Sequence, residues 1–228
     1  MVSSRWDDTE LVKALGRTTK ANYVRTHIKE SLEETVNPLL KGEKLLFSES
    51  IDHILLSIFT HIDLLGCVYK GETSQSNAVA FLREYLGRID PRYKDVGGLL
   101  YASQRHGLVH LATPKRIQLL NGMILDFSYV LYGERKDHLK VVKQRVIEEG
   151  KRFDIYVLVL NISLLYTDLL SAIDEYAKDI CLSEELAEAF WESFTVRRTK
   201  EAREEEMRRK PYIQDSDFVF ITEQIARL

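Results

Sequence analysis

The chain has 228 residues, 45% of them hydrophobic, and a formal net charge of −3 at pH 7. This apolar content is enough for a sizeable core and excludes a fully disordered chain, while the small net charge gives no overall attraction to nucleic acid or membranes. We expect one elaborated domain over residues 1–228, with a helical bundle core at 20–110, a β insertion at 115–160, returning helices at 161–195, and a charged helix and tail at 196–228.

The first half of the chain has the apolar spacing of amphipathic helices. We predict helices over residues 22–40, 48–69, 76–86 and 93–109. Four helices of this kind predict a bundle in which the first two pack together. Ser48 or Ser50 can cap the second helix, whose apolar residues at helical spacing are Ile51, Ile54, Leu55, Ile58, Ile62 and Leu65.

The periodicity changes after residue 115. Residues 116–120 and 123–131 flank Asn121-Gly122, the kind of pair that best accepts positive φ at a two-residue turn, and so predict a β-hairpin. Two more strands are predicted at 138–142 and 153–160, which are rich in β-branched and aromatic residues. These strands predict an antiparallel insertion in an otherwise helical chain, which makes the fold class α+β, mainly α.

The chain returns to helix after these strands. Asn161 or Ser163 can cap a helix that runs through Tyr176, and Ser183 can cap an amphipathic helix that contains Phe190. Residues 197–210 carry eleven charges in fourteen positions, and their mixed signs favour a solvated helix over a nucleic-acid-binding arm. The apolar segment 218–221 has the composition of an edge strand.

The cysteines and the N-terminus indicate the compartment. Cys67 and Cys181 are too few and too far apart for a disulfide framework or a zinc site. The N-terminal segment shows no apolar run before a small-residue cleavage site, and no stretch approaches the roughly 20 uninterrupted apolar residues of a membrane span. We therefore expect a cytoplasmic protein that makes no use of a membrane, a metal or another cofactor.

One segment combines anion binding with proton transfer. Arg105 is permanently charged and presents a planar fork of donors, whereas His106 and His110 can each hold or release a proton near neutral pH. On a helix the two histidines lie one turn apart on the same face, and Gly107 between them permits close approach of a backbone or ligand. Residues 83–116 hold seven cations against three anions, which predicts a local field that attracts phosphate.

Three further side chains are candidates for this site. Asp63 on the second predicted helix can reach and orient Arg105, and Tyr93 and Tyr101 flank the motif, where an aromatic face can stack on a base. Ordinary roles compete with each of these. Asp63 also fits a solvent-facing stripe, and the tyrosines also fit the core or an interface.

Other chemistries fit the pattern less well. His106 and His110 have the spacing of metal ligands, but no glutamate stands beside the first histidine and no third ligand is evident. Gly97-Gly98 lacks the lysine and the spacing of a P-loop, and no serine or cysteine elbow is present. These patterns argue against a metalloenzyme, an NTPase and a covalent hydrolase.

The segment Arg105-His106-Gly107-Leu108-Val109-His110, at the end of a predicted bundle helix, resembles the motif of the HEPN superfamily: an arginine, a polar residue, three variable positions and a histidine. The resemblance extends over residues 48–176. It implies a HEPN-like antiparallel helical bundle, commonly a homodimer whose motif helices face each other. It also implies a metal-independent ribonuclease of toxin, phage-defence or RNA-processing systems, for which an antitoxin or defence protein is an expected partner.

The same resemblance assigns the arginine role to Arg105, the polar position to His106, and the general acid or base to His110. Asparagine or aspartate is more common than histidine at the polar position, so which histidine acts as acid and which as base stays open. Single-stranded RNA would be cleaved by its own 2′-hydroxyl, with Arg105 stabilising the developing charge. The alternatives are a non-catalytic nucleotide- or RNA-binding or dimerisation module and a purely structural oligomer.

Overall fold

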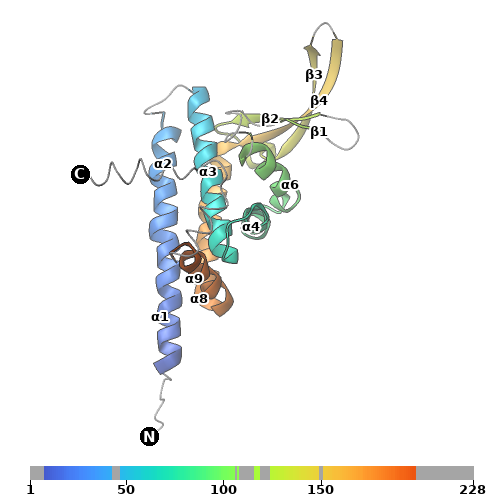
Figure 1. The fold of residues 1–228 in the computed structure, drawn as a ribbon. Helices are drawn as coiled ribbons and strands as arrows, with labels where there is room; N and C mark the ends of the chain where they lie inside the picture. Colours follow the sequence, from blue (N-terminus) through green and yellow to red (C-terminus); the bar gives the residue numbers. More distant parts are fainter. Residues whose placement is uncertain are drawn as a thin grey trace, which may run out of the picture.

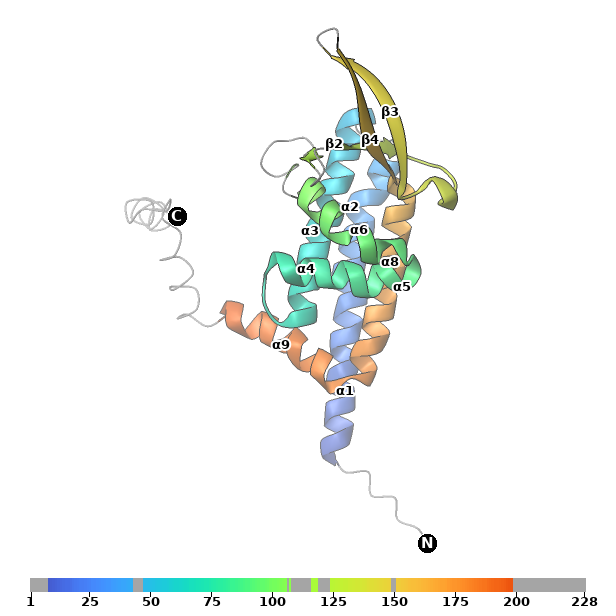
Figure 2. The same cartoon turned by 90° about the vertical axis from the view of Figure 1, so that its right-hand side faces the viewer.

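The computed structural model describes residues 8–42, 47–105, 107, 116–118, 124–148 and 151–198. This part of the chain is mainly helical, with one small sheet at one end of the helices (Figure 1). The predicted fold class, α+β and mainly α, is therefore confirmed. Seen from the side, the long helices run roughly along one direction and the sheet rises above them (Figure 2).

A continuous helical rod forms one side of the body. It consists of α1 (Asp8–Tyr23), a wider π-helical segment η1 (Val24–Lys29) and α2 (Glu30–Leu40). We predicted only residues 22–40 as helix, because the regular apolar stripe begins at that point. The stripe recurs every four residues and its members are at most 2% exposed: Val24, Ile28, Leu32 and Val36.

The helix α3 (Phe47–Lys70) lies antiparallel to this rod and confirms the helix predicted at 48–69 (Figure 1). Its six predicted core residues are all buried, at most 7% exposed. On another face, Gly66 lies against α4 (Gln75–Phe81), where an added Cβ would come within 2.5 Å of the Ala78 backbone. The two helices pack this closely because Gly66 has no side chain.

One helix in the described part of the chain is apolar and long enough to cross a membrane. It is α3, through its segment Ile51–Lys70, and 56% of the most apolar window is buried inside the protein. The buried core helix of a soluble protein has the same length and composition.

Two short helical runs follow α3 and lead to the predicted motif. The first comprises α4, η2 (Leu82–Leu86) and α5 (Gly87–Ile89), and is capped by Ser74, whose hydroxyl accepts from the Asn77 amide at 3.1 Å. After Pro91 the second comprises α6 (Arg92–Leu100) and the π-helical η3 (Tyr101–Arg105). These runs agree with the predicted helices at 76–86 and 93–109. Of the last four residues of the second helix, only Gly107 lies within the described ranges.

The sheet contains β1 (Ile117–Gln118), β2 (Ile124–Val130), β3 (Lys140–Glu148) and β4 (Lys151–Asn161), in the order β1-β2-β4-β3. β2 and β4 are parallel, whereas the other two pairs are antiparallel. The predicted all-antiparallel insertion is therefore wrong. The return strand β4 runs between β2 and β3, so β2 becomes its parallel neighbour rather than the partner of β3.

The strand boundaries also differ from the prediction. β3 and β4 pair from Lys140 with Val159 to Glu148 with Lys151, a longer hairpin than the predicted strands 138–142 and 153–160. In the first hairpin, Gln118 pairs with Ile124, whereas a two-residue turn at Asn121-Gly122 would pair it with residue 125. The register is thus shifted by one residue, and the turn itself lies outside the described residues.

Two helices close the described chain. α8 (Ile162–Leu182) is capped by Asn161, whose side chain accepts from the Leu164 amide at 3.1 Å. The helix packs on the rod and on α3. α9 (Glu184–Arg198) follows Ser183, which accepts from the Leu186 amide at 3.3 Å, and crosses α3. The caps predicted at Asn161 and Ser183 are confirmed. Residues 199–228, with the predicted edge strand at 218–221, lie outside the described ranges.

Candidate functional site

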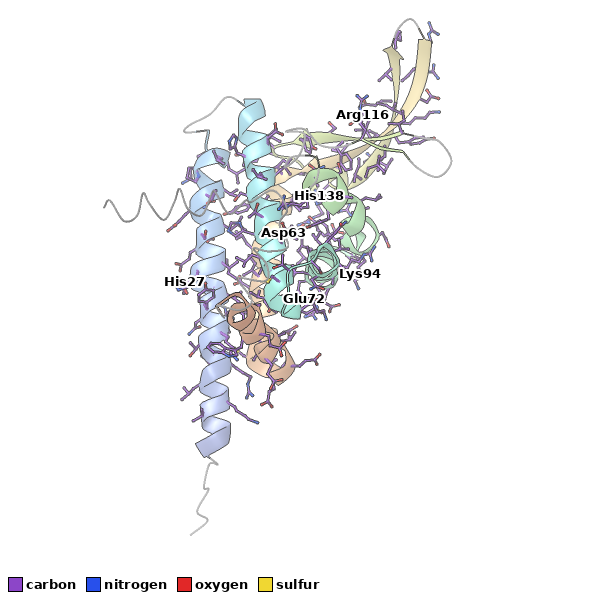
Figure 3. All side chains as sticks on the ribbon, viewed as in Figure 1. His27, Asp63, Glu72, Lys94, Arg116 and His138 are labelled. Carbon is purple, nitrogen blue, oxygen red and sulfur yellow. The ribbon has the colours of Figure 1, made fainter. Side chains whose placement is uncertain are left out.

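Three of the predicted site residues meet between α3 and η3. We call them the Arg105 group: Asp63, Tyr101 and Arg105. The Tyr101 hydroxyl donates to Asp63 Oδ1 at 2.5 Å, and Arg105 Nε–H donates to Asp63 Oδ2. Tyr101 and Arg105 are four residues apart, so both project from one face of η3 toward α3, where Figure 3 labels Asp63. The contact that we expected between Asp63 and Arg105 is present.

The Arg105 side chain is anchored on one edge. Its side chain is 28% exposed and that of Asp63 is 19% exposed, so the ion pair lies at the margin of the core. Within the described part of the chain, the Nη1 and Nη2 edge of the guanidinium has no hydrogen-bond partner. That edge carries the parallel N–H donors that bind two oxygens of one phosphate.

Tyr101 holds the carboxylate in place. Burial, followed by the hydrogen bond to Asp63, raises the pKa of Tyr101, so its hydroxyl stays protonated and remains a donor at neutral pH. Asp63 therefore accepts from both side chains at once. This arrangement fixes the direction of the Arg105 guanidinium before any ligand arrives.

The segment η3 that carries the group is fixed to the sheet. The segment η3 is a π-helix, a widened form of helical turn that often occurs at functional sites. Gln104, fully buried, accepts a hydrogen bond from the Tyr129 hydroxyl of β2 at 2.9 Å. This hydrogen bond links the residue before Arg105 to β2.

The two predicted catalytic histidines are not placed by the structure. His106 and His110 lie outside the described residues, and the described Gly107 between them is buried. Their roles stay predictions from the sequence. What the structure adds is the position of Arg105, the residue immediately before them.

Tyr93 is not part of the Arg105 group. It is fully buried, its hydroxyl lies 2.7 Å from His138 Nε2, and it donates to Asp168 Oδ2 at 3.0 Å. An aromatic ring with almost no exposed surface cannot stack on a base, so the expected base-stacking role fits neither Tyr93 nor Tyr101, which is 6% exposed. Proximity in the sequence was misleading, because Tyr93 lies on the buried face of α6 and bonds to His138 and Asp168.

Tyr93 belongs to a second polar group, which we call the junction cluster because it joins α6, the segment η4 (Arg135–Asp137) and α8 where the sheet meets the helices. Arg135 binds Asp168 with both terminal nitrogens, at 2.5 and 2.7 Å, and Arg92 binds Asp90 at 2.5 Å. Two guanidinium groups thus balance two buried carboxylates. The members are Asp90, Arg92, Tyr93, Arg135, His138 and Asp168.

His138, labelled in Figure 3, is the centre of the junction cluster. The backbone N–H of Asn161 donates to its Nδ1 at 3.1 Å, so the ring proton is on Nε2, which donates to the Tyr93 oxygen. Tyr93 can then donate to Asp168, and every group has a partner. Burial, the largest cause, lowers the pKa of His138 to about 4 despite the attraction of Asp168. The imidazole is therefore neutral at pH 7.

The junction cluster was not foreseen from the sequence, although one signal was present. On α8, Asp168 falls among Leu165, Leu169 and Ile173, which form the buried stripe of that helix. A carboxylate on an apolar stripe needs a charged partner, because burial without one is costly. The sequence could not show that Arg135 is that partner, since the two residues come together only through the fold.

Two hollows of the described surface do not involve either group. One, on α2, has a volume of about 440 Å³, and the other, between the end of α3 and α9, about 300 Å³. Three glutamates line each of them, so both repel phosphate. The glutamates are Glu30, Glu33 and Glu34 in the first, and Glu185, Glu188 and Glu192 in the second.

Neither a metal site among the described residues nor a similar protein indicates the function. Among the described residues, no group of three or more histidine, cysteine, aspartate or glutamate side chains is arranged to hold a metal ion. Comparison of the chain with protein-family models, with curated proteins and with solved structures finds no match.

Proposed function

We propose that the chain is a metal-independent endoribonuclease that cleaves single-stranded RNA through its 2′-hydroxyl, in a toxin or defence-type role, and that it acts as a homodimer. The observation that supports this most directly is the state of Arg105. Its Nε is held by Asp63, its Nη edge has no partner in the described part of the chain, and two histidines follow it in the sequence.

In this reaction the 2′-oxygen of one nucleotide attacks the adjacent phosphorus, and the bond from phosphorus to the 5′-oxygen breaks. One histidine accepts the 2′-hydroxyl proton, and a second group protonates the departing 5′-oxygen, leaving a 2′,3′-cyclic phosphate. His106 and His110 are the candidates for these proton transfers. Arg105 would bind the non-bridging oxygens, where negative charge increases in the transition state.

Asp63 and Tyr101 would act as positioning residues. A guanidinium that is free to rotate loses conformational entropy when it clamps a phosphate, whereas an anchored one has already lost much of it. Asp63 also withdraws part of the positive potential of Arg105. This weakens binding of the ground-state phosphodiester, so the selectivity for the transition state would come from the fixed direction of the guanidinium.

The same ion pair favours a second candidate function. The Asp63 carboxylate bound to Arg105 lowers the net charge of the site. Such a pairing is also expected if the role of Arg105 is only to stabilise the end of its helix. On this interpretation the chain is a non-catalytic nucleotide- or RNA-binding or dimerisation module. The two functions differ in turnover, which can be measured.

The test is incubation of the protein with 5′-labelled single-stranded RNA in EDTA. We expect fragments that end in 2′,3′-cyclic phosphate, and a rate that falls about 100- to 1000-fold in Arg105→Ala and about 100-fold or more in His110→Ala. Arg105→Lys, which keeps the charge and loses the fork, should recover only part of the rate.

A matched control is Arg17→Ala. Arg17 is also a partly buried arginine with an anchored Nε, which donates to the Cys181 carbonyl at 3.1 Å, but it lies on α1. Its replacement should leave cleavage unchanged. RNA that stays intact with the folded wild-type protein, but binds through Arg105, would establish the binding module instead, and loss of cleavage in both arginine variants would point to general destabilisation.

A further inference from the structure

The strand β3 forms an open edge of the sheet. In the order β1-β2-β4-β3 its one described neighbour is β4, so the other side of Lys140–Glu148 presents a row of backbone donors and acceptors without a strand partner in the described part of the chain. The outer part of β3 and β4 extends beyond the helices in both views (Figures 1 and 2), which leaves this edge accessible.

The edge is unusually apolar for a strand in water. Val141 is 54% exposed and Ile147 is 70% exposed. Both belong to the same face as Lys143 and Arg145, because side chains two residues apart along a strand share a face. Open edges normally avoid exposed apolar side chains, since these promote pairing with another chain.

The sequence of β3 is nearly symmetric about Gln144. It reads Lys-Val-Val-Lys-Gln-Arg-Val-Ile-Glu, so residues one, two and three positions from Gln144 match in kind, and the outermost pair has opposite charges. An antiparallel pair of identical strands centred on Gln144 would place Val141 opposite Ile147 and Val142 opposite Val146 of the second copy. It would also place Lys140 opposite position 148, a glutamate in the sequence. No other centre in β3 pairs both apolar sets in this way.

We infer that β3 pairs with β3 of a second copy of this chain, antiparallel and centred on Gln144, to form a continuous sheet across a twofold axis. Such a contact is self-complementary, as closed dimers require. It extends the ladder of backbone hydrogen bonds and buries four exposed apolar side chains, namely Val141 and Ile147 of each copy. This interface does not depend on the ribonuclease proposal, and it makes no use of the Arg105 group.

One kind of pair in this register, which occurs on both sides of the twofold axis, is unfavourable. Lys143 would face Arg145 of the second copy, and like charges directly opposite each other destabilise a sheet. In each chain, however, Asp154 of β4 binds Lys143 Nζ at 2.6 Å and Arg145 Nε at 3.3 Å. The carboxylates reduce the repulsion, and the remaining positive charge should make the dimer more stable as salt is added, through screening.

Cysteine crosslinking tests the register directly. In Gln144→Cys the two cysteines face each other across the axis, with Cα atoms about 4.5 to 5.5 Å apart, within disulfide range. In Lys140→Cys, the matched control on the same strand, the two cysteines are about 27 Å apart. Mild oxidation of the full chain should therefore yield a covalent dimer from Gln144→Cys and not from Lys140→Cys. Equal crosslinking of both, or of neither, would overturn the register.

Sedimentation equilibrium measures the interface without a crosslink. Ile147→Lys should raise the dimer dissociation constant at least about 30-fold, because both copies lose an apolar contact, while circular dichroism stays unchanged. Leu182→Lys is the control, since Leu182 is 84% exposed at the end of α8. A wild-type chain that stays monomeric at all concentrations, or an Ile147→Lys chain that dimerises equally well, would contradict the proposal.

Discussion

The Arg105 group and the junction cluster are built from the same residue types, arginine, aspartate and tyrosine, yet they differ in how completely these groups are used. In the junction cluster Asp168 is 2% exposed and accepts from Arg135 and Tyr93 together, and His138 uses both ring nitrogens. In the Arg105 group the arginine engages Asp63 through Nε, and its Nη edge has no hydrogen-bond partner among the described residues.

We infer that Arg135 is a structural residue, whereas Arg105 is a candidate to bind an anion. Both carboxylates of the junction cluster are paired with guanidinium groups, and these ion pairs hold α6, η4 and α8 together. The Nη edge of Arg105 has no hydrogen-bond partner among the described residues, so that edge can bind an anion. Substitutions of residues in the two groups test this contrast.

The two arginines should differ most in what they contribute to folding. We expect Arg135→Ala to lower the free energy of unfolding by about 3–5 kcal/mol, because it leaves the Asp168 carboxylate buried without its cation. Arg105→Ala should cost about 1 kcal/mol, since Asp63 is partly exposed and keeps its bond to Tyr101. Urea denaturation measures both, and equal losses would mean that Arg105 is also a structural residue.

The neutral His138 should make stability depend on pH. Its folded pKa is lowered from 6.5 to about 4, so the unfolded chain binds more protons between these values. The stability that His138 contributes is therefore fully present above about pH 6.5 and is lost as the pH falls toward 4, by at most about 3 kcal/mol. The measurement is the pH dependence of the urea midpoint.

Aspartate and glutamate side chains also titrate in acid. The pH dependence of the wild type must therefore be compared with that of His138→Gln. This variant keeps a polar side chain and removes the titrating ring. Its unfolding free energy should fall less steeply between pH 6.5 and 4.5 than that of the wild type. Parallel curves for the two proteins would show that His138 is not the group responsible.

Replacing Asp63 should separate binding from turnover at the proposed site. In Asp63→Asn the side chain keeps its shape and loses its charge, so Arg105 gains positive potential and loses orientation. We expect kcat for RNA cleavage to fall about tenfold while KM stays the same or decreases. Asp126→Asn, which removes the partner of the exposed Arg116, is the control and should change neither constant. A rise in KM alone would assign Asp63 to substrate binding.

The smallest effect is expected from Tyr101→Phe. The substitution removes the hydroxyl that donates to Asp63 at 2.5 Å and keeps the ring, at a cost of about 1 kcal/mol in unfolding free energy. Cleavage should fall by less than in Asp63→Asn, because the ion pair with Arg105 remains. Thermal unfolding and the cleavage assay together measure this, and a loss as large as that of Arg105→Ala would give Tyr101 a more direct role.

Local patterns in the sequence determined much of the fold. The apolar stripe of α3, the rod from Val24 onward and the caps at Asn161 and Ser183 follow from helical periodicity and from hydrogen bonds between residues three apart, which the sequence shows directly. The α+β class followed from these elements. The resemblance also singled out Arg105, and Asp63 was predicted as its partner.

Only the tertiary structure decided how these elements combine. The placing of β4 between β2 and β3, the pairing of Asp168 with Arg135 and the inward position of Tyr93 depend on residues far apart in the chain. Periodicity reports which face of an element is apolar, but strand order and charge pairing are set by the packing of whole elements against one another. The sequence pattern therefore pointed to Arg105 as a candidate, and the fold determined that its Nε binds Asp63.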